Sequence, residues 1–152
     1  MPKRIPTPKF SQRHLAKRLR KLIGTWRLEG RFTGGLEEMV ERGTVSFRWL
    51  VKDALVIVRS NTRVAPKSVA VIGADDTFNT FTMVYSDARG VVRRYDMTLD
   101  ARRWTLRRRQ RGFLQRFIGR FSRDGRTIHA TWEKSSNGRR WMKDFDLVYR
   151  KK

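Results

Sequence analysis

The stretch VVRRYDMTLDARRWTLRRRQ, residues 91–110, decides the fold. Apolar and polar side chains alternate through 91–99 and again through 103–110, and a short turn at Asp100-Ala101 separates the two runs. Successive residues of a strand point to opposite faces of a sheet, so the alternation predicts two strands that share one apolar face. A turn this short joins antiparallel neighbours, because a parallel pair needs a crossover of a dozen or more residues.

The same pattern continues on both sides of this hairpin. Turn-forming pairs, among them Asp124-Gly125 and Asn137-Gly138, separate the runs, and these two pairs predict two-residue hairpins. The predicted strands are residues 25–33, 38–50, 54–63, 68–74, 78–86, 91–99, 103–110, 114–122, 126–134 and 139–149. No segment of helical length lies between them. The sequence therefore predicts an all-β fold, an up-and-down barrel of about ten antiparallel strands.

The large aromatic side chains explain why this sheet should close. In each predicted strand the apolar residues occupy every second position, and all five tryptophans and all three tyrosines fall on these positions. They are therefore expected on one side of one sheet. A sheet of this size closes or packs on itself because open edges promote aggregation. The runs 54–63 and 68–74 are apolar on both parities, which leaves their facing open.

Residues 1–23 read differently from the rest. Prolines keep the start irregular, Ser11 offers a helix N-cap, and Gly24 is a natural stop. The helical stripe between them consists of Phe10, Leu15, Leu19, Leu22 and Ile23. We therefore expect a basic N-terminal arm and amphipathic helix over 1–23 and the barrel over 24–152. The stripe packs on its own barrel or, alternatively, lies on an anionic membrane.

The composition sets further limits. The 152 residues suit one domain, and 36 Lys and Arg against 14 Asp and Glu give a formal charge of +22. No cysteine and only two histidines are present, which argues against disulfides, thiolate chemistry and a multi-histidine metal site. No catalytic residue, metal or cofactor is implied. No apolar run reaches the roughly 18 residues of a membrane helix, and no signal peptide is evident, so we expect a cytoplasmic protein.

A ten-stranded barrel has room for a small ligand. Arg93 with Tyr85 and Tyr95 is the candidate clamp for an anionic group, since an arginine fork fits a carboxylate. The predicted ligand-binding residues are Arg59, Tyr85, Arg93, Tyr95, Trp49, Trp104, Trp132 and Phe117. Two explanations compete for the inward polar side chains. Either they bind a small, largely apolar molecule that can carry an acidic group, or Glu41 pairs with an arginine and water fills the middle.

Several stretches resemble a known group of proteins. They are LIGTWRLEGRFTGG (22–35), VSFRWLVKDALVIVRS (45–60), SVAVIGADDTFNTFTMVYSDARGVVRRYDM (68–97) and FSRDGRTIHATWEKSSNGRRWMKDFDLVYRK (121–151). Together they look like the uncharacterised bacterial lipocalin-like domains of the calycin superfamily, and Gly24-Thr25-Trp26 matches the Gly-x-Trp signature of that superfamily. The resemblance implies a calycin barrel with an internal cavity and says little about chemistry. It also implies that Trp26 packs at the closed end, under an arginine for which Arg150 or Arg140 is the candidate.

Two relatives of that superfamily fit less well. Fatty-acid-binding proteins carry a helical lid between the first two strands, where this chain has only a turn at residues 33–37. Haem-binding, nitrobindin-like barrels need an axial histidine, and His129 has the outward parity. The resemblance therefore favours neither a lid nor haem.

Two other kinds of function remain as alternatives. The basic exterior, with residues 102–111 as its densest stretch, predicts binding to nucleic acid or another anionic surface, although the inward parity of Trp104 argues against stacking on a base. An isomerase or cyclase that uses tyrosine and arginine inside the barrel is the second alternative. Asp144 and Asp146 have the outward parity, so we expect them to form solvated ion pairs.

Overall fold

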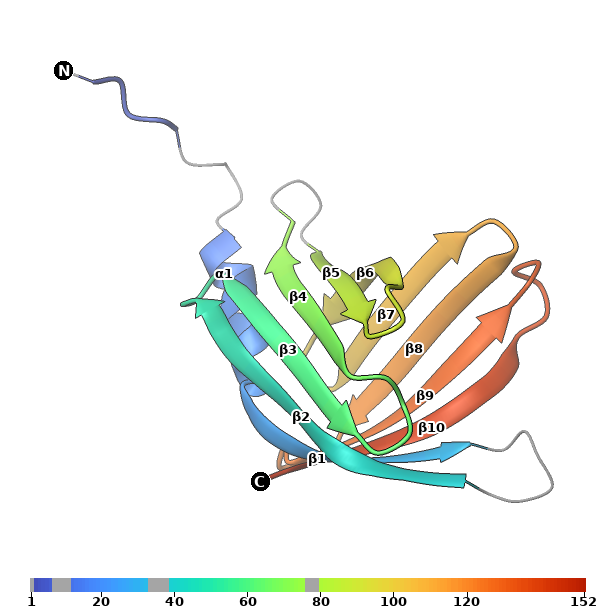
Figure 1. Ribbon diagram of the computed structural model, residues 1–152. Coiled ribbons are helices and arrows are strands. Elements are labelled where there is room, and N and C mark those ends of the chain that lie inside the picture. Colours follow the sequence, from blue (N-terminus) through green and yellow to red (C-terminus); the bar gives the residue numbers. More distant parts are fainter. Residues whose placement is uncertain (1, 7–11, 33–38, 76–79) are drawn as a thin grey trace.

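In the computed structural model, which describes residues 2–6, 12–32, 39–75 and 80–152, ten antiparallel strands form a closed barrel (Figure 1). The strands are β1 (Gly24–Phe32), β2 (Met39–Val51), β3 (Leu55–Thr62), β4 (Ser68–Ala74), β5 (Phe81–Asp87), β6 (Val92–Leu99), β7 (Arg103–Gln110), β8 (Phe113–Phe121), β9 (Thr127–Ser135) and β10 (Met142–Lys151). Each strand pairs with its neighbour in sequence, and β1 pairs with β10 to close the sheet. The predicted fold class is confirmed.

The turns are less regular than the sequence predicts. The two-residue hairpin lies at Arg111-Gly112, where Gln110 pairs with Phe113 and Gly112 has a φ of 81°. The connection at Asn137-Gly138 is longer, residues 136–141, because the Asn137 side chain accepts hydrogen bonds from the backbone of the next residues and holds a wider loop. The β8–β9 connection is also longer, residues 122–126. The predicted turn at 33–37 and most of the β4–β5 connection lie outside the described residues.

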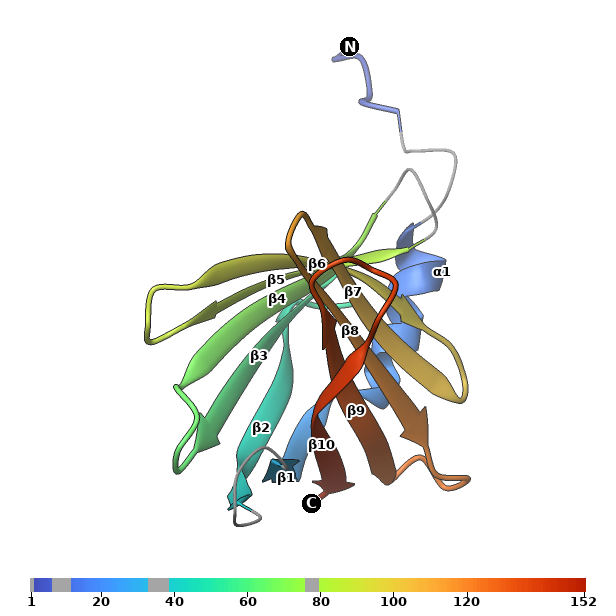
Figure 2. The ribbon, with the colours of Figure 1, turned by 90° about the vertical axis from the view of Figure 1, so that its right-hand side faces the viewer.

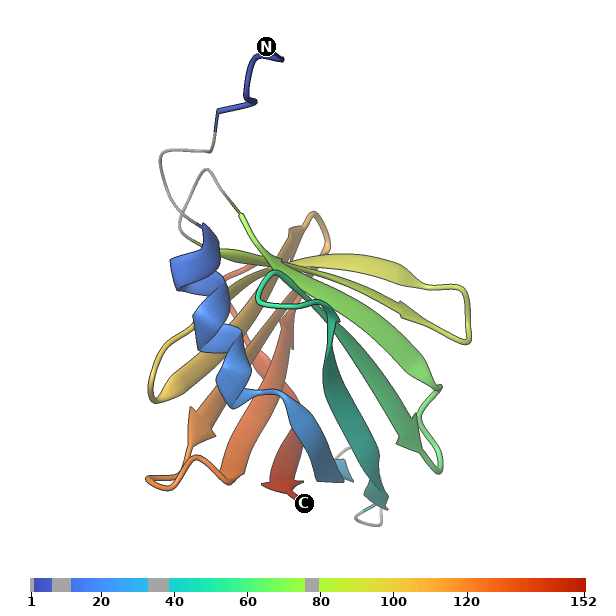
Figure 3. The same ribbon diagram turned by 90° about the vertical axis from the view of Figure 1, so that its left-hand side faces the viewer.

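The barrel has two different ends. The connections 52–54, 100–102 and 122–126 lie at the end where the N-terminal helix sits, which we call the helix end (Figure 3). The connections 63–67, 88–91, 111–112 and 136–141 surround the opposite end, which we call the far end (Figure 2). Up-and-down connectivity thus places alternate turns at opposite ends.

The helix end is covered by α1 (Gln12–Ala16) and the 3-10 helix η1 (Lys17–Lys21). Leu15, Leu19 and Leu22 are buried there, so the stripe packs on its own barrel. The ammonium of Lys21 donates to the carbonyl oxygens of Asp100 and Ala101, at 2.8 and 2.7 Å. Phe10 and Ser11 lie outside the described residues.

Trp26 is fully buried at the helix end, as the resemblance implies. Its indole N–H donates to the carbonyl oxygen of Leu22 at 2.8 Å, which ties β1 to the helix. The cation beside its ring is Lys151, with the ammonium 5.2 Å from the ring centroid, so the expectation of Arg150 or Arg140 is wrong. Trp26 and Lys151 face each other in the β1–β10 register, whereas Arg150 lies on the opposite face of its strand.

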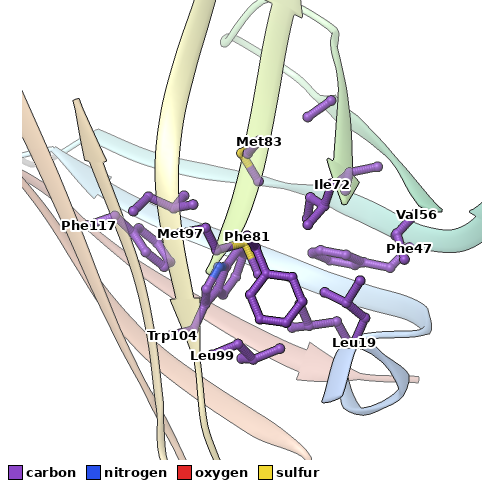
Figure 4. Packing of buried hydrophobic residues seen from close by; sticks show 14 of the residues in the cluster. Leu19, Phe47, Val56, Ile72, Phe81, Met83, Met97, Leu99, Trp104 and Phe117 are labelled. Atoms are coloured by element: carbon purple, nitrogen blue, oxygen red, sulfur yellow. The ribbon is translucent and has the colours of Figure 1, made fainter. Parts of the chain in front are cut away.

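Side chains fill this end of the barrel. Figure 4 shows Phe81, Met97 and Leu99 packed close to Leu19 and Ile72, and each of these side chains is at most 2% exposed. None of them lines the cavity that extends toward the far end. Buried side chains therefore fill the core at the helix end, and this cavity lies nearer the far end.

Candidate functional site

Beyond this core the barrel is hollow. A cavity of about 640 Å³ extends toward the far end, and most of its wall is apolar. Its buried apolar wall includes Val45, Phe47, Val58, Ala70, Met83, Leu106 and Leu147. The charged residues of its wall, Glu41, Arg89, Arg93 and Asp144, come from strand ends and loops at the far end.

Six of the eight predicted binding residues line this cavity. They are Tyr85, Arg93, Tyr95, Trp104, Phe117 and Trp132. Four of their rings form a continuous wall. The centroids are 4.6 Å apart between Trp104 and Phe117, 5.1 Å between Phe117 and Trp132, and 5.5 Å between Trp132 and Tyr95. The alternation of apolar and polar residues along each strand was enough to predict that these side chains share one face of the sheet.

The inward placements of Arg59 and Trp141 are wrong, whereas Trp49 faces inward without reaching the cavity. Arg59 is exposed on the outer face of β3, because its neighbours Val58 and Ser60 line the cavity and the residue between two inward positions must point outward. Trp49 packs against the core without lining the cavity, since it lies near the helix end of β2. Trp141 precedes β10, in the 136–141 loop, and lies on the outer surface under the guanidinium of Arg116, 4.1 Å from the ring centroid.

The carboxylate of Asp87 already binds two of the polar side chains near the far end. It accepts hydrogen bonds from the Tyr85 hydroxyl at 2.8 Å and from the Arg89 guanidinium at 2.8 Å. The Arg89 hydrogen bond holds the pKa of Asp87 far below its usual range, and burial raises the pKa of Tyr85 to about 12. Tyr85 is thus an uncharged donor that already has an acceptor, so its hydroxyl hydrogen is not free for the predicted clamp of Arg93 with Tyr85 and Tyr95.

The two carboxylates of the cavity wall also have hydrogen-bond or ion-pair partners. Glu41, 3% exposed, accepts hydrogen bonds from the backbone N–H groups of residues 63–65, so the prediction that it pairs with an arginine is wrong. Asp144 forms an ion pair with Lys134 at 3.3 Å. A β-bulge between Lys143 and Phe145 turns Asp144 toward the cavity and leaves Lys143 exposed, so the predicted outward facing of Asp144 is wrong.

Arg93 has a different environment. Its guanidinium lies 5.3 Å from the ring centroid of Phe113, and among the described residues no carboxylate lies within ion-pair distance of it. Next to it, the Tyr95 hydroxyl donates to the side-chain oxygen of Gln115 at 2.8 Å. Burial raises the pKa of Tyr95, against the opposing effects of a hydrogen bond from Arg93 and of the positive charges of Arg93 and Arg108. Two cations therefore flank a neutral hydroxyl at the far end.

Gln115 and the Asp87–Arg89 pair are not among the binding residues predicted from the sequence. Gln115 has the parity of Phe117 on β8, so the signal was present. Arg89 lies in a turn, where periodicity gives no information about direction. Its contact with Asp87 depends on the fold of that turn.

In the described part of the chain, no group of three His, Asp or Glu side chains is placed to hold a metal ion. His129 is exposed on the outer face, as predicted. Neither helical segment among the residues described above has the length and apolar character needed to cross a membrane.

Comparison with protein-family models and with curated proteins finds no match for this chain. Among solved structures, the chain is similar to the crystal structure of Rv2717c from M. tuberculosis. The TM-score is 0.66 and the identity 12%, over 91% of this chain and 97% of the other. At that identity the similarity supports the barrel fold alone.

Proposed function

We propose that this protein binds a small, largely apolar molecule with an acidic group inside the barrel, in the manner of the lipocalin-like domains that its sequence resembles. The observation that carries the proposal is Arg93, a cation at the end of an apolar cavity with no carboxylate partner among the described residues. A carboxylate or similar anion fits such a guanidinium through charge-assisted hydrogen bonds.

The size of the cavity agrees with this class of ligand. Sites for small molecules usually measure roughly 300–1,000 Å³ and combine apolar walls with a few polar groups that fix orientation. The cavity here, about 640 Å³, is apolar along most of its wall and polar near the far end. We place the acidic group of the ligand between Arg93 and the Tyr95–Gln115 pair, with the apolar body directed toward Trp104 and Phe117.

Binding of hexadecanoic acid and of hexadecanol tests this arrangement. Arg93→Gln should weaken binding of the acid by about tenfold or more, because a hydrogen bond to a charged group contributes about 1.5–3 kcal/mol. The alcohol should bind wild type and variant alike. Arg94→Gln is the matched control, since Arg94 is the adjacent residue and is exposed. Calorimetry or displacement of a fluorescent fatty acid measures both.

A wild-type protein that takes up neither acid, alcohol nor hydrophobic dye, and that carries no small molecule in native mass spectrometry after purification, would contradict the proposal. An equal loss of acid binding in Arg93→Gln and Arg94→Gln would remove Arg93 from it.

A second candidate function is binding of nucleic acid on the outer face of β7 and β8. Arg107 and Arg116 face each other across these strands, and a second pocket of about 280 Å³ beside them is lined by Arg107, Arg108, Arg109, Arg116 and Trp141, among others. Glu133 already holds the Arg116 guanidinium at 3.0 Å, so Arg107 and Arg109 are the cations of this surface that phosphates would neutralise. Trp104 is buried and takes no part.

Binding to mixed-sequence DNA and RNA over a range of salt concentrations tests this candidate. The double variant Arg107→Gln, Arg109→Gln should reduce both the affinity and the salt dependence, because a complex with fewer phosphate contacts releases fewer counterions when it forms. Lys52→Gln with Arg63→Gln is the matched control, with the same loss of charge at exposed positions elsewhere. Equal losses in both double variants would indicate a response to net charge and no site.

A further inference from the structure

A second pair of polar groups lies at the inner end of the cavity. Trp104 is the second residue of β7 and Tyr149 the third from last of β10, so both lie toward the helix end, and both line the cavity. Their ring centroids are 5.8 Å apart. We call these two side chains the inner pair.

Neither member of the inner pair has a hydrogen-bond partner among the described residues. Trp104 is 3% exposed, and its indole N–H (blue in Figure 4) is buried without an acceptor. Tyr149 is 7% exposed, and burial raises the pKa of its hydroxyl well above the ordinary tyrosine value, so the hydroxyl remains protonated. Buried indole and phenol groups normally find a partner, as Trp26 does with Leu22 in this protein.

The surroundings restrict what can satisfy these donors. Leu106, Phe117 and Val45 line the cavity with the inner pair, and the charged residues of the wall lie at the other end. An anion here would be buried without a counter-charge, which is costly, whereas a neutral oxygen needs only hydrogen bonds. The donors therefore favour an uncharged acceptor.

We infer that Trp104 and Tyr149 form a second polar subsite, which binds an uncharged carbonyl or ether oxygen at the end of the ligand remote from its acidic group. This inference rests on the proposed function, because the cavity must hold a ligand for its inner end to be occupied. It narrows the ligand class to molecules with an acidic head, an apolar middle and a neutral oxygen.

The spacing of the two subsites follows from the register. Arg93 and Leu99 are six residues apart on β6, and Leu99 pairs with Trp104, so the backbone positions of the subsites differ by about 20 Å along the strand at about 3.3 Å per residue. The side chains reach inward from both ends and shorten this span. Probes of two lengths are therefore appropriate.

The probes are hexadecanoic acid and dodecanoic acid, each compared with the derivative that carries a ketone next to its terminal methyl group. Each pair differs by one oxygen in place of two hydrogens. In a purely apolar cavity the ketone would weaken binding, because it gives up its hydrogen bonds to water. We expect wild-type protein to bind the oxo acid of one length at least as tightly as the parent acid.

Three variants locate the effect. Tyr149→Phe and Trp104→Phe should each lower the affinity for that oxo acid, relative to the parent acid in the same variant, roughly tenfold. Trp104→Phe also shortens the apolar wall for both acids, so the ratio of the two affinities is the readout, and continued binding of the parent acid shows that the cavity is folded. Tyr95→Phe is the control, since it removes a hydroxyl at the far end and should change both acids equally. In the bound protein the Trp104 indole N–H resonance should lie further downfield with the oxo acid than with the parent acid, because only the oxo acid accepts its hydrogen bond.

The possible results separate the two proposals. If neither acid binds, the proposed function is wrong and the inner subsite falls with it. If both acids bind and their affinity ratio is the same in wild type, Tyr149→Phe and Trp104→Phe, the inner subsite is overturned while the cavity remains a binding site. If the ratio falls only in Tyr149→Phe, the indole N–H is directed at the Phe117 ring, 4.6 Å away between centroids, and the pairing of the two donors is overturned.

Discussion

At the scale of single residues, Asp87 makes the stability of the barrel depend on pH. Its carboxylate is buried and holds together the Tyr85 hydroxyl and the Arg89 guanidinium. The pKa of Asp87 is depressed in the folded protein, mainly by the hydrogen bond from Arg89. A depressed carboxyl pKa stabilises the fold above the unfolded value of about 4, and this stabilisation is lost as the pH falls further.

We therefore predict that the melting temperature of the wild-type protein decreases more between pH 6 and pH 3 than that of Asp87→Asn. The variant should be less stable at pH 7, because Arg89 loses its partner, and less sensitive to acid. Thermal melts followed by circular dichroism measure both. Asp96→Asn is the control, because the Asp96 side chain is 62% exposed and should leave the acid sensitivity unchanged. Parallel curves for wild type and Asp87→Asn would contradict the role given to this carboxylate.

At the scale of elements, the N-terminal helix acts as a plug for the helix end. Leu19 of η1 is fully buried against the core, whereas its neighbour Arg18 is exposed. We predict that Leu19→Ala lowers the free energy of unfolding by about 2–5 kcal/mol, the usual cost of such a cavity, and that Arg18→Ala changes it by less than about 0.5 kcal/mol. Urea denaturation measures the difference, and similar values for both variants would show that the helix contributes little to the fold.

The strands themselves were accessible from the sequence for a simple reason. Alternation is a local property, so each run such as β6 or β7 could be located without knowledge of its partners, and the predicted boundaries differ from the observed ones by at most three residues. The inward aromatic wall followed from the same period. Arg93 and Tyr95 were placed correctly because polar and apolar residues of β6 alternate clearly.

Errors arose where the period carries no information about facing. β3 is apolar on both parities, and so Arg59 could be assigned to either face. The bulge at Asp144 changes the direction of side chains in β10 and depends on the pairing with β9, which no single run reveals. The contact of Glu41 with the backbone of residues 63–65 joins positions more than twenty residues apart, and only the closed barrel brings them together.

At the scale of the whole molecule, the formal charge of +22 must be accommodated on the outside of the barrel. Arg27 faces Arg150 and Arg103 faces Arg120 across neighbouring strands, whereas in a third such pair, Arg107 with Arg116, the Arg116 guanidinium is held by Glu133. Such pairs repel, and a high net charge destabilises a compact state. The exposed ion pairs, such as Arg20 with Asp53, compensate little, since each contributes about 0–1 kcal/mol.

Self-repulsion of this kind has a testable consequence. We predict that the melting temperature rises as sodium chloride increases from about 0.02 to 0.5 M, because the screening distance falls over this range from about 20 Å to about 4 Å. Arg27→Glu should raise the stability at low salt by about 0.5–1 kcal/mol, since an opposite charge then faces Arg150. Arg123→Glu, in the β8–β9 connection, changes the net charge equally and is the control. A larger gain for Arg27→Glu than for Arg123→Glu assigns the effect to the cross-strand pair. Equal gains would assign it to net charge alone, and a melting temperature that falls with salt would show that the ion pairs outweigh the repulsion.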